Sequence, residues 1–174
     1  MTMNNMKRNG SARTGGGGAA RQAGGRGFVD GYLAYLLARA SHEVSRQFHA
    51  QIRRAGLAVP QWRVLATLWG GAGLSIGALA RIVIVPQPTL TKIVDRMERA
   101  GLVARSTAPD ARRSTRVRLT AKGRARAAPL IALARSHERA VLKGTPAAEI
   151  ASLKRLLAAL SERCAAAPVR PPGR

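Results

Sequence analysis

The stretch from Pro109 to Gly123, PDARRSTRVRLTAKG, decides the fold class of this chain. It sets five cations against one acid, and its second half alternates arginine with valine and leucine. Such alternation is typical of a β-strand that packs on one face and stays wet on the other. The preceding LVARST, residues 102–107, supplies a partner strand, and the residues between them are rich in turn formers. We predict a two-stranded hairpin with Arg112 and Arg113 at its tip.

Two short helices are expected directly before the hairpin. Ser75 is a good N-cap for the first, which directs Ile76, Leu79 and Val83 inward. The second is QPTLTKIVDRMERAG, residues 87–101, where a helical period places leucine, isoleucine, valine and methionine on one side. Its other side is polar and cationic. A pair of helices followed by a hairpin is the pattern of a winged helix-turn-helix.

Longer helices are expected on both sides of this unit. Apolar residues recur at three- and four-residue steps from Phe28 to about Ala55, and Thr120 can cap a helix running to about Lys143 with a bend at Pro129. A last helix after Pro146 carries an apolar seam that should pack on a partner helix, from the first helix or from a second copy of the chain. The seam consists of Ile150, Leu153, Leu157, Leu160 and Cys164. In this seam we favour a packed Cys164 thiol over a redox switch.

The charge balance indicates a polyanionic partner. The 174 residues contain 30 Lys and Arg against 8 Asp and Glu, a net charge of +22, which attracts DNA, RNA or an anionic membrane alike. Twelve of these cations fall between Arg81 and Arg126, with three acids, and we expect this excess to lie on a DNA-binding face. Residues 1–27 are rich in glycine and basic, and together with residues 167–174 we expect them to be disordered.

Composition also narrows the class of protein. A single cysteine excludes an intrachain disulfide framework, and the N-terminal stretch shows no secretory signal, so we expect a cytoplasmic protein. The longest uncharged run, Val64 to Ala80, is broken by glycines, which argues against a membrane span. No motif for a catalytic site, a cofactor or a metal ion stands out, and few acids are present for acid and base catalysis. An enzyme is therefore not expected.

Four segments stand in a characteristic order and spacing: PQWRVLATL, LSIGALARIV, PTLTKIVDRMERAGLV and PDARRSTRVRLTAKGR. On these segments, which cover Val59 to Arg124, the chain resembles the MarR family of winged helix-turn-helix transcription regulators. The resemblance implies a mainly α fold with a small β wing. The DNA-binding unit would span residues 57–120, and residues 28–56 and 121–166 would form the helical dimerisation region.

The resemblance also implies a homodimer that binds double-stranded DNA at an inverted repeat, as a probable repressor. The residues placed at base edges, phosphates or the minor groove are Pro88, Thr89, Thr91, Lys92, Arg96, Arg112, Arg113 and Arg116. A pocket for a small effector, with an aromatic acid as one candidate, would lie near Arg39, His42, Arg46 and Trp62.

Two positions depart from the family pattern. Ala111 stands where the wing usually has an aspartate, with Asp110 one place earlier, which puts the usual wing-bracing salt bridge in doubt. Pro86 stands where a capping serine is frequent, so the recognition helix should begin without a side-chain cap. For Asp95 we expect a structural role through ion pairs with Lys92 and Arg99 on the same helix.

Two other functions compete with a specific regulator. The charge excess and the basic tail also suit an architectural protein that binds DNA or RNA largely without sequence preference. An enzyme with an unrecognised site is the weaker alternative, since no feature of the sequence favours it.

Overall fold

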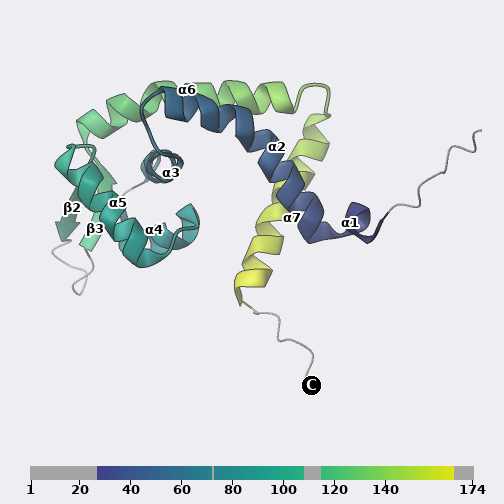
Figure 1. Cartoon of the computed structure of the whole chain (residues 1–174), viewed down its shortest axis with the longest axis horizontal. Helices are drawn as coiled ribbons and strands as arrows, with labels where there is room; N and C mark the ends of the chain where they lie inside the picture. The colour runs from purple at the N-terminus through teal and green to yellow at the C-terminus, as the bar shows by residue number, and fades with distance from the viewer. Residues whose placement is uncertain (1–26, 72, 108–114, 167–174) are drawn as a thin grey trace, which may run out of the picture. The chain divides into compact units, whose positions relative to one another are not determined.

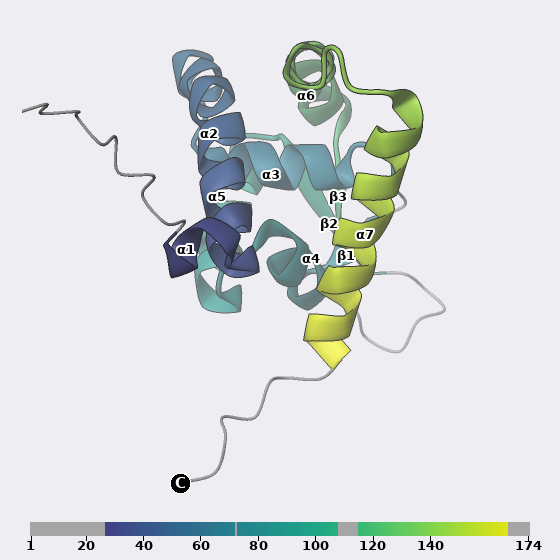
Figure 2. The same cartoon turned by 90° about the vertical axis from the view of Figure 1, so that its right-hand side faces the viewer.

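The computed structural model describes residues 27–71, 73–107 and 115–166. Its helices and strands follow one another along the chain as α1 (Phe28–Gly31), α2 (Leu33–Arg54), α3 (Val59–Leu68), β1 (Leu74–Ser75), α4 (Ile76–Val83), α5 (Gln87–Arg99), β2 (Val103–Thr107), β3 (Thr115–Leu119), α6 (Ala121–Val141) and α7 (Ala147–Ala166). The mainly α fold with a small β wing is confirmed (Figure 1), and Figure 2 shows the same fold turned by 90°. Both terminal segments expected to be disordered lie outside the described residues, except Gly27.

The chain divides into two compact units, one up to Arg39 and one from Ala40 onward. In the first unit, the single helix predicted from Phe28 is wrong, because α1 ends at Gly31 and Tyr32 adopts an extended conformation. Glycine is a poor helix former, so the chain can leave the helix there at little cost. The rings of Phe28 and Tyr32 stack with centroids 5.0 Å apart across this break.

The second unit encloses one hydrophobic core. Helices α3, α4 and α5 supply most of it, and α2, α6 and the sheet complete it. Ser75 caps α4 as predicted, since its hydroxyl accepts from the N–H of Ala78 at 3.2 Å. Trp62 is buried in this core and meets the ring of Phe48 edge-on at 5.3 Å.

The wing contains one more strand than expected. Strands β2 and β3 form the predicted antiparallel hairpin, with Val103 opposite Leu119, and β3 also pairs with the two-residue β1 through Leu74 opposite Val117. The sheet order is therefore β1-β3-β2. Val117 and Leu119 are buried as the alternation predicts, whereas Thr115 is exposed because it lies at the outer end of the strand.

The start of α6 is fastened to the base of the wing. The hydroxyl of Thr120 donates to the carbonyl of Gly101 at 2.6 Å and accepts from the N–H of Gly123 at 2.9 Å. The Thr120 N–H donates to the carbonyl of Leu102 at 3.2 Å. Gly101 itself adopts the left-handed conformation typical of a helix end, with φ of 71°. These bonds join the end of α5, the sheet and α6 at one point.

Helix α6 continues through Pro129 and stops at Val141, and α7 then follows. Helix α7 buries no residue, although the predicted apolar seam lies on it. Leu153 and Leu157 remain 50% and 39% exposed, and Cys164 is exposed. The predicted packing of the Cys164 thiol is therefore not found within the single chain.

A substitution at Gly123 tests the contact between α6 and the wing base. A Cβ at this position would lie 1.9 Å from the carbonyl oxygen of Leu102, so α6 or the sheet would have to shift. We expect Gly123→Ala to lower the free energy of unfolding by about 3 kcal/mol, the upper end of ordinary overpacking, as measured by urea denaturation. Gly31→Ala, with no neighbour within 4 Å, is the control and should not destabilise. Equal stability of both variants would contradict this account.

Candidate nucleic-acid interface

Helix α5 presents two chemically different sides. Leu90, Val94 and Met97 have no exposed surface and fix the helix on the core. The opposite side exposes Pro88, Thr89, Lys92 and Arg96, four of the residues predicted to meet DNA. Lys92 and Arg96 are one turn apart. A helix held by its apolar stripe, with short polar groups near its N-terminus and cations beyond them, has the form of a recognition helix.

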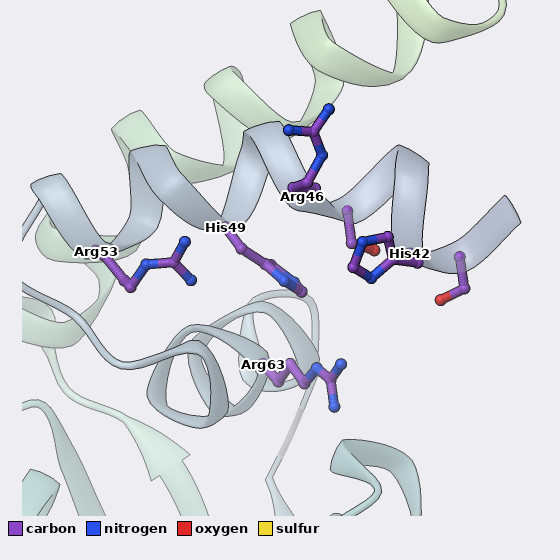
Figure 3. A pocket seen from close by; sticks show the side chains of 7 residues that line it. His42, Arg46, His49, Arg53 and Arg63 are labelled. Carbon is purple, nitrogen blue, oxygen red and sulfur yellow. The ribbon is translucent and has the colours of Figure 1, made fainter. Parts of the chain in front are cut away.

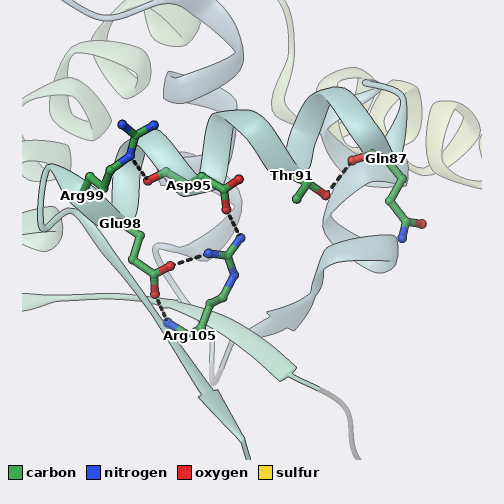
Figure 4. A network of polar contacts seen from close by, with 6 residues as sticks. All are labelled: Gln87, Thr91, Asp95, Glu98, Arg99 and Arg105. Carbon is green, nitrogen blue, oxygen red and sulfur yellow. Dashed lines mark hydrogen bonds and ion pairs between the residues drawn. The ribbon is translucent and has the colours of Figure 1, made fainter.

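Thr91 differs from its neighbours. It is only partly exposed, and its hydroxyl donates to the carbonyl of Gln87 at 3.0 Å (Figure 4). The hydroxyl proton is thus engaged within the helix in the DNA-free chain. Its oxygen lone pairs and methyl group remain for contacts. The N-cap of α5 is Pro86, which makes no side-chain capping bond, as predicted.

An ion-pair network joins α5 to the wing (Figure 4). The Arg105 guanidinium, on β2, donates to Asp95 Oδ1 at 2.6 Å and also pairs with Glu98, while the backbone N–H of Arg105 donates to Glu98 Oε1 at 2.9 Å. The hydrogen bond that Arg105 donates to Asp95 is the main cause that raises the pKa of Arg105; burial opposes this rise and Glu98 adds to it. One arginine therefore holds a wing strand against the recognition helix.

This network corrects the role expected for Asp95. Its structural role holds, but its side chain pairs with Arg105 and not with Lys92 or Arg99. Arg99 instead donates to the backbone carbonyl of Asp95 at 3.4 Å. The guanidinium of Arg105 approaches both carboxylates from a neighbouring strand, so it satisfies two acids at once.

We expected the cations from Arg81 to Arg126 to lie on one DNA-binding face, but several of them make contacts elsewhere. Arg105 is used in the network, Arg124 donates to the carbonyl of Trp69 at 3.2 Å, and Arg126 donates to that of Ala55. Arg116 and Arg118 are exposed on β3, and Arg116 donates to the carbonyl of Gly73 at 3.4 Å. The predicted wing-tip residues Arg112 and Arg113, with Asp110 and Ala111, lie outside the described residues.

A second candidate site is a pocket between α2 and α3, of about 310 Å³ (Figure 3). Its lining consists of hydroxyl, imidazole and guanidinium groups: Ser41, His42, Ser45, Arg46, His49, Arg53 and Arg63. None of these lining residues is acidic. Burial, helped by Arg63 and then Arg53, lowers the pKa of His49, so this imidazole is neutral at pH 7. A pocket of this composition favours an anion.

Two of the four predicted pocket residues, His42 and Arg46, line this cavity. Trp62 is buried and borders a different hollow with Trp69 and Arg135, while Arg39 is an exposed residue of α2. No local sequence pattern selects His49, Arg53 or Arg63, because the pocket forms only where folding brings Arg63 of α3 beside these α2 side chains. Among the residues that the structure describes, no cluster suited to a metal ion occurs, and no helix is long and apolar enough to cross a membrane.

Known proteins are similar to this chain in sequence. The model of the MarR family matches residues 57–115. The HTH-type transcriptional repressor Rv2887 of Mycobacterium tuberculosis is 33% identical over 128 residues, which cover 74% of this chain and 92% of that protein.

Solved structures are similar over most of the chain. A MarR family transcriptional regulator, SPO1453 from Silicibacter pomeroyi, is 46% identical with a TM-score of 0.68, covering 76% of this chain and 97% of its own. NadR in complex with 4-hydroxyphenylacetate is 27% identical with a TM-score of 0.70, covering 74% of this chain and 92% of its own.

Removal of Arg105 should loosen the wing. Arg105→Met leaves Asp95 and Glu98 side by side without their cation, and these side chains are only partly exposed. We expect the free energy of unfolding to fall by about 1 to 2 kcal/mol, less than for a fully buried charged pair because water screens the site. Urea denaturation measures this. The control is Arg46→Met, which breaks a 3.8 Å pair with Glu43 that is more than 60% exposed; a loss as large as that of Arg105→Met would refute the bracing role.

Proposed function

We propose, given that the chain belongs to the MarR family of transcriptional regulators, that it is a homodimeric repressor that binds a specific DNA duplex and is released by a small anion. Members of this family are transcriptional regulators and not enzymes. Relatives such as the one from Mycobacterium tuberculosis are named repressors, which supports repression here.

The observation that carries the DNA-binding proposal is the exposed polar side of α5, together with the exposed arginines Arg116 and Arg118 on β3. Pro88, Thr89 and Lys92 would enter the major groove, where short polar side chains and lysine can distinguish base edges. Arg96 and Arg116 would contact phosphates and fix the position of the helix without reading sequence. Thr91 would contribute its methyl group and lone pairs, and Arg112 and Arg113 would extend from the wing into the minor groove.

The exposed apolar surface of α7 supports a homodimer. Leu153, Leu156 and Leu157 are 50%, 63% and 39% exposed, and a groove beside α7 is also lined by Val44, Val141 and Ile150. Burying this surface against a second copy would remove it from water, which is the main driving force of association. A two-fold dimer presents two recognition helices and therefore requires an inverted-repeat operator.

The cationic pocket supports an anionic effector. His42, Arg46, His49 and Arg63 come from two helices and offer several donors with no acid among the lining residues. An aromatic carboxylate would satisfy both the cations and the adjacent carbon surface of the helices. NadR, a structural neighbour, binds 4-hydroxyphenylacetate, and this compound is a suitable first probe.

Selection of bound duplexes from a random pool tests the function as a whole. A specific regulator should enrich an inverted repeat, and its complex should survive a large excess of random duplex. Loss of the complex under that competition would instead support the architectural, largely non-specific binder. Protection of a single asymmetric half-site in a footprint would contradict the dimer.

Lys92 gives a residue-level test of the interface. We expect Lys92→Ala to weaken binding to the selected duplex by about 1 to 3 kcal/mol, and to flatten the salt dependence if the lysine contacts a phosphate. The matched control is Lys143→Ala, an exposed lysine between α6 and α7, which should leave affinity within twofold. Fluorescence anisotropy at several salt concentrations measures both. Equal effects of the two substitutions would remove Lys92 from the interface.

His49 gives a test of the pocket that depends on pH. Because its pKa in the folded chain lies below the ordinary value of 6.5, the stability it contributes is present above pH 6.5 and is lost as the pH falls through the lowered pKa. An anion in the pocket stabilises the imidazolium and should raise that pKa. Histidine NMR titrations with and without 4-hydroxyphenylacetate measure both values. A free His49 that titrates at or above 6.5 would contradict this description.

A further inference from the structure

Arg63 belongs to two sites at once. Its side chain lines the cationic pocket (Figure 3), and its Nη1 also donates to the carbonyl of Val83, the last residue of α4, at 3.2 Å. Arg53 lines the same pocket from α2 and makes no hydrogen bond to α4 among the residues that the structure describes, so it provides a natural comparison. The two arginines therefore share a pocket but differ in what else they hold.

The end of α4 is a demanding turn. Ile84 adopts a left-handed conformation with φ of 58°, which is costly for a β-branched residue, and its side chain is 80% exposed, so packing offers little in return. The turn is closed by the N–H groups of Ile84 and Val85, which donate to the carbonyls of Arg81 and Ala80 at 3.3 and 3.1 Å.

Arg63 completes this turn. The last carbonyls of a helix lack partners within the helix, and a cation near them is also favoured by the helix dipole. The Arg63 guanidinium gives the carbonyl of Val83 a hydrogen-bond donor and places a positive charge at the end of α4. The next residues, Val85 and Pro86, lead directly into α5, so the turn held by Arg63 sets where the recognition helix begins.

We propose that Arg63 couples the pocket to the recognition helix: an anion in the pocket competes with the Val83 carbonyl for the Arg63 guanidinium and thereby loosens the turn between α4 and α5. This proposal rests on the DNA-binding function proposed above. A carboxylate offers the guanidinium an opposite charge and two parallel hydrogen bonds, which a single neutral carbonyl does not, so the anion prefers the state in which Arg63 has left the turn. That difference in affinity is what a shift between two states requires.

Hydrogen exchange on the DNA-free protein tests the coupling. Arg63→Met and Arg53→Met each remove one positive charge from the pocket, but only the first removes the bond to Val83. We expect Arg63→Met to raise the exchange rates of the Ile84 and Val85 amides by about tenfold and Arg53→Met to leave them within twofold, since coupling energies commonly correspond to 5- to 150-fold effects. Affinity for the selected duplex should also fall more in Arg63→Met than in Arg53→Met.

The anion supplies the second arm. In the wild type, 4-hydroxyphenylacetate at constant ionic strength, added until the His49 resonances stop shifting, should raise exchange at the same two amides and should add nothing in Arg63→Met. Ile84→Asn is the rescue variant, because asparagine tolerates the left-handed conformation. Combined with Arg63→Met, it should bring exchange at the turn back toward the wild-type rate.

The outcomes separate this coupling from the DNA-binding proposal. Equal exchange rates at the turn in Arg63→Met and Arg53→Met overturn the coupling, even if DNA binding is intact. The coupling is also overturned if 4-hydroxyphenylacetate saturates the wild-type pocket and the exchange rates at the turn do not change. Failure of the wild type to select any duplex overturns the DNA-binding function, whatever the exchange rates are.

Discussion

The burial of one stripe on α5 is the constraint on which the rest depends. Leu90, Val94 and Met97 are fully removed from water, a burial of several kcal/mol that leaves the helix a single way to lie on the core. Its polar side must then face outward, toward any partner. In the function proposed above, the pocket, the wing and the turn between α4 and α5 would each act on a helix whose rotation is already fixed.

Acidic groups are scarce in this chain, and two of them join the wing to α5. Only 8 Asp and Glu accompany 30 Lys and Arg, yet two of the eight, Asp95 and Glu98, are used by Arg105. Without them the wing strand would present a further repelling cation to α5. The departure at Ala111 therefore does not leave the wing unbraced, since its base is held by a separate ion pair.

Much of the fold follows from local pattern, and less of the site does. Local sequence locates α5, the β2–β3 hairpin and the Ser75 cap because each depends on residues close together in the chain. Periodicity indicates the helix and the hairpin, and the residue type indicates the cap. Strand β1, with two residues, has no period to detect, and the helix break at Tyr32 depends on a single glycine. The partner of Asp95 and the dual position of Arg63 depend on contacts between elements distant in sequence, which no local pattern encodes. For the same reason, only two of the four residues predicted for the pocket, His42 and Arg46, line it.

The bonds made by Thr120 have a mechanical consequence. Its backbone and hydroxyl tie Leu102 and Gly101 to the first turn of α6, and Gly123 allows the helix to approach the wing base without a gap. Tilting of α6 would therefore be transmitted to the wing as by a rigid lever arm. In a two-fold assembly, the tilt of α6 would determine whether the separation of the two α5 helices matches the pitch of the double helix.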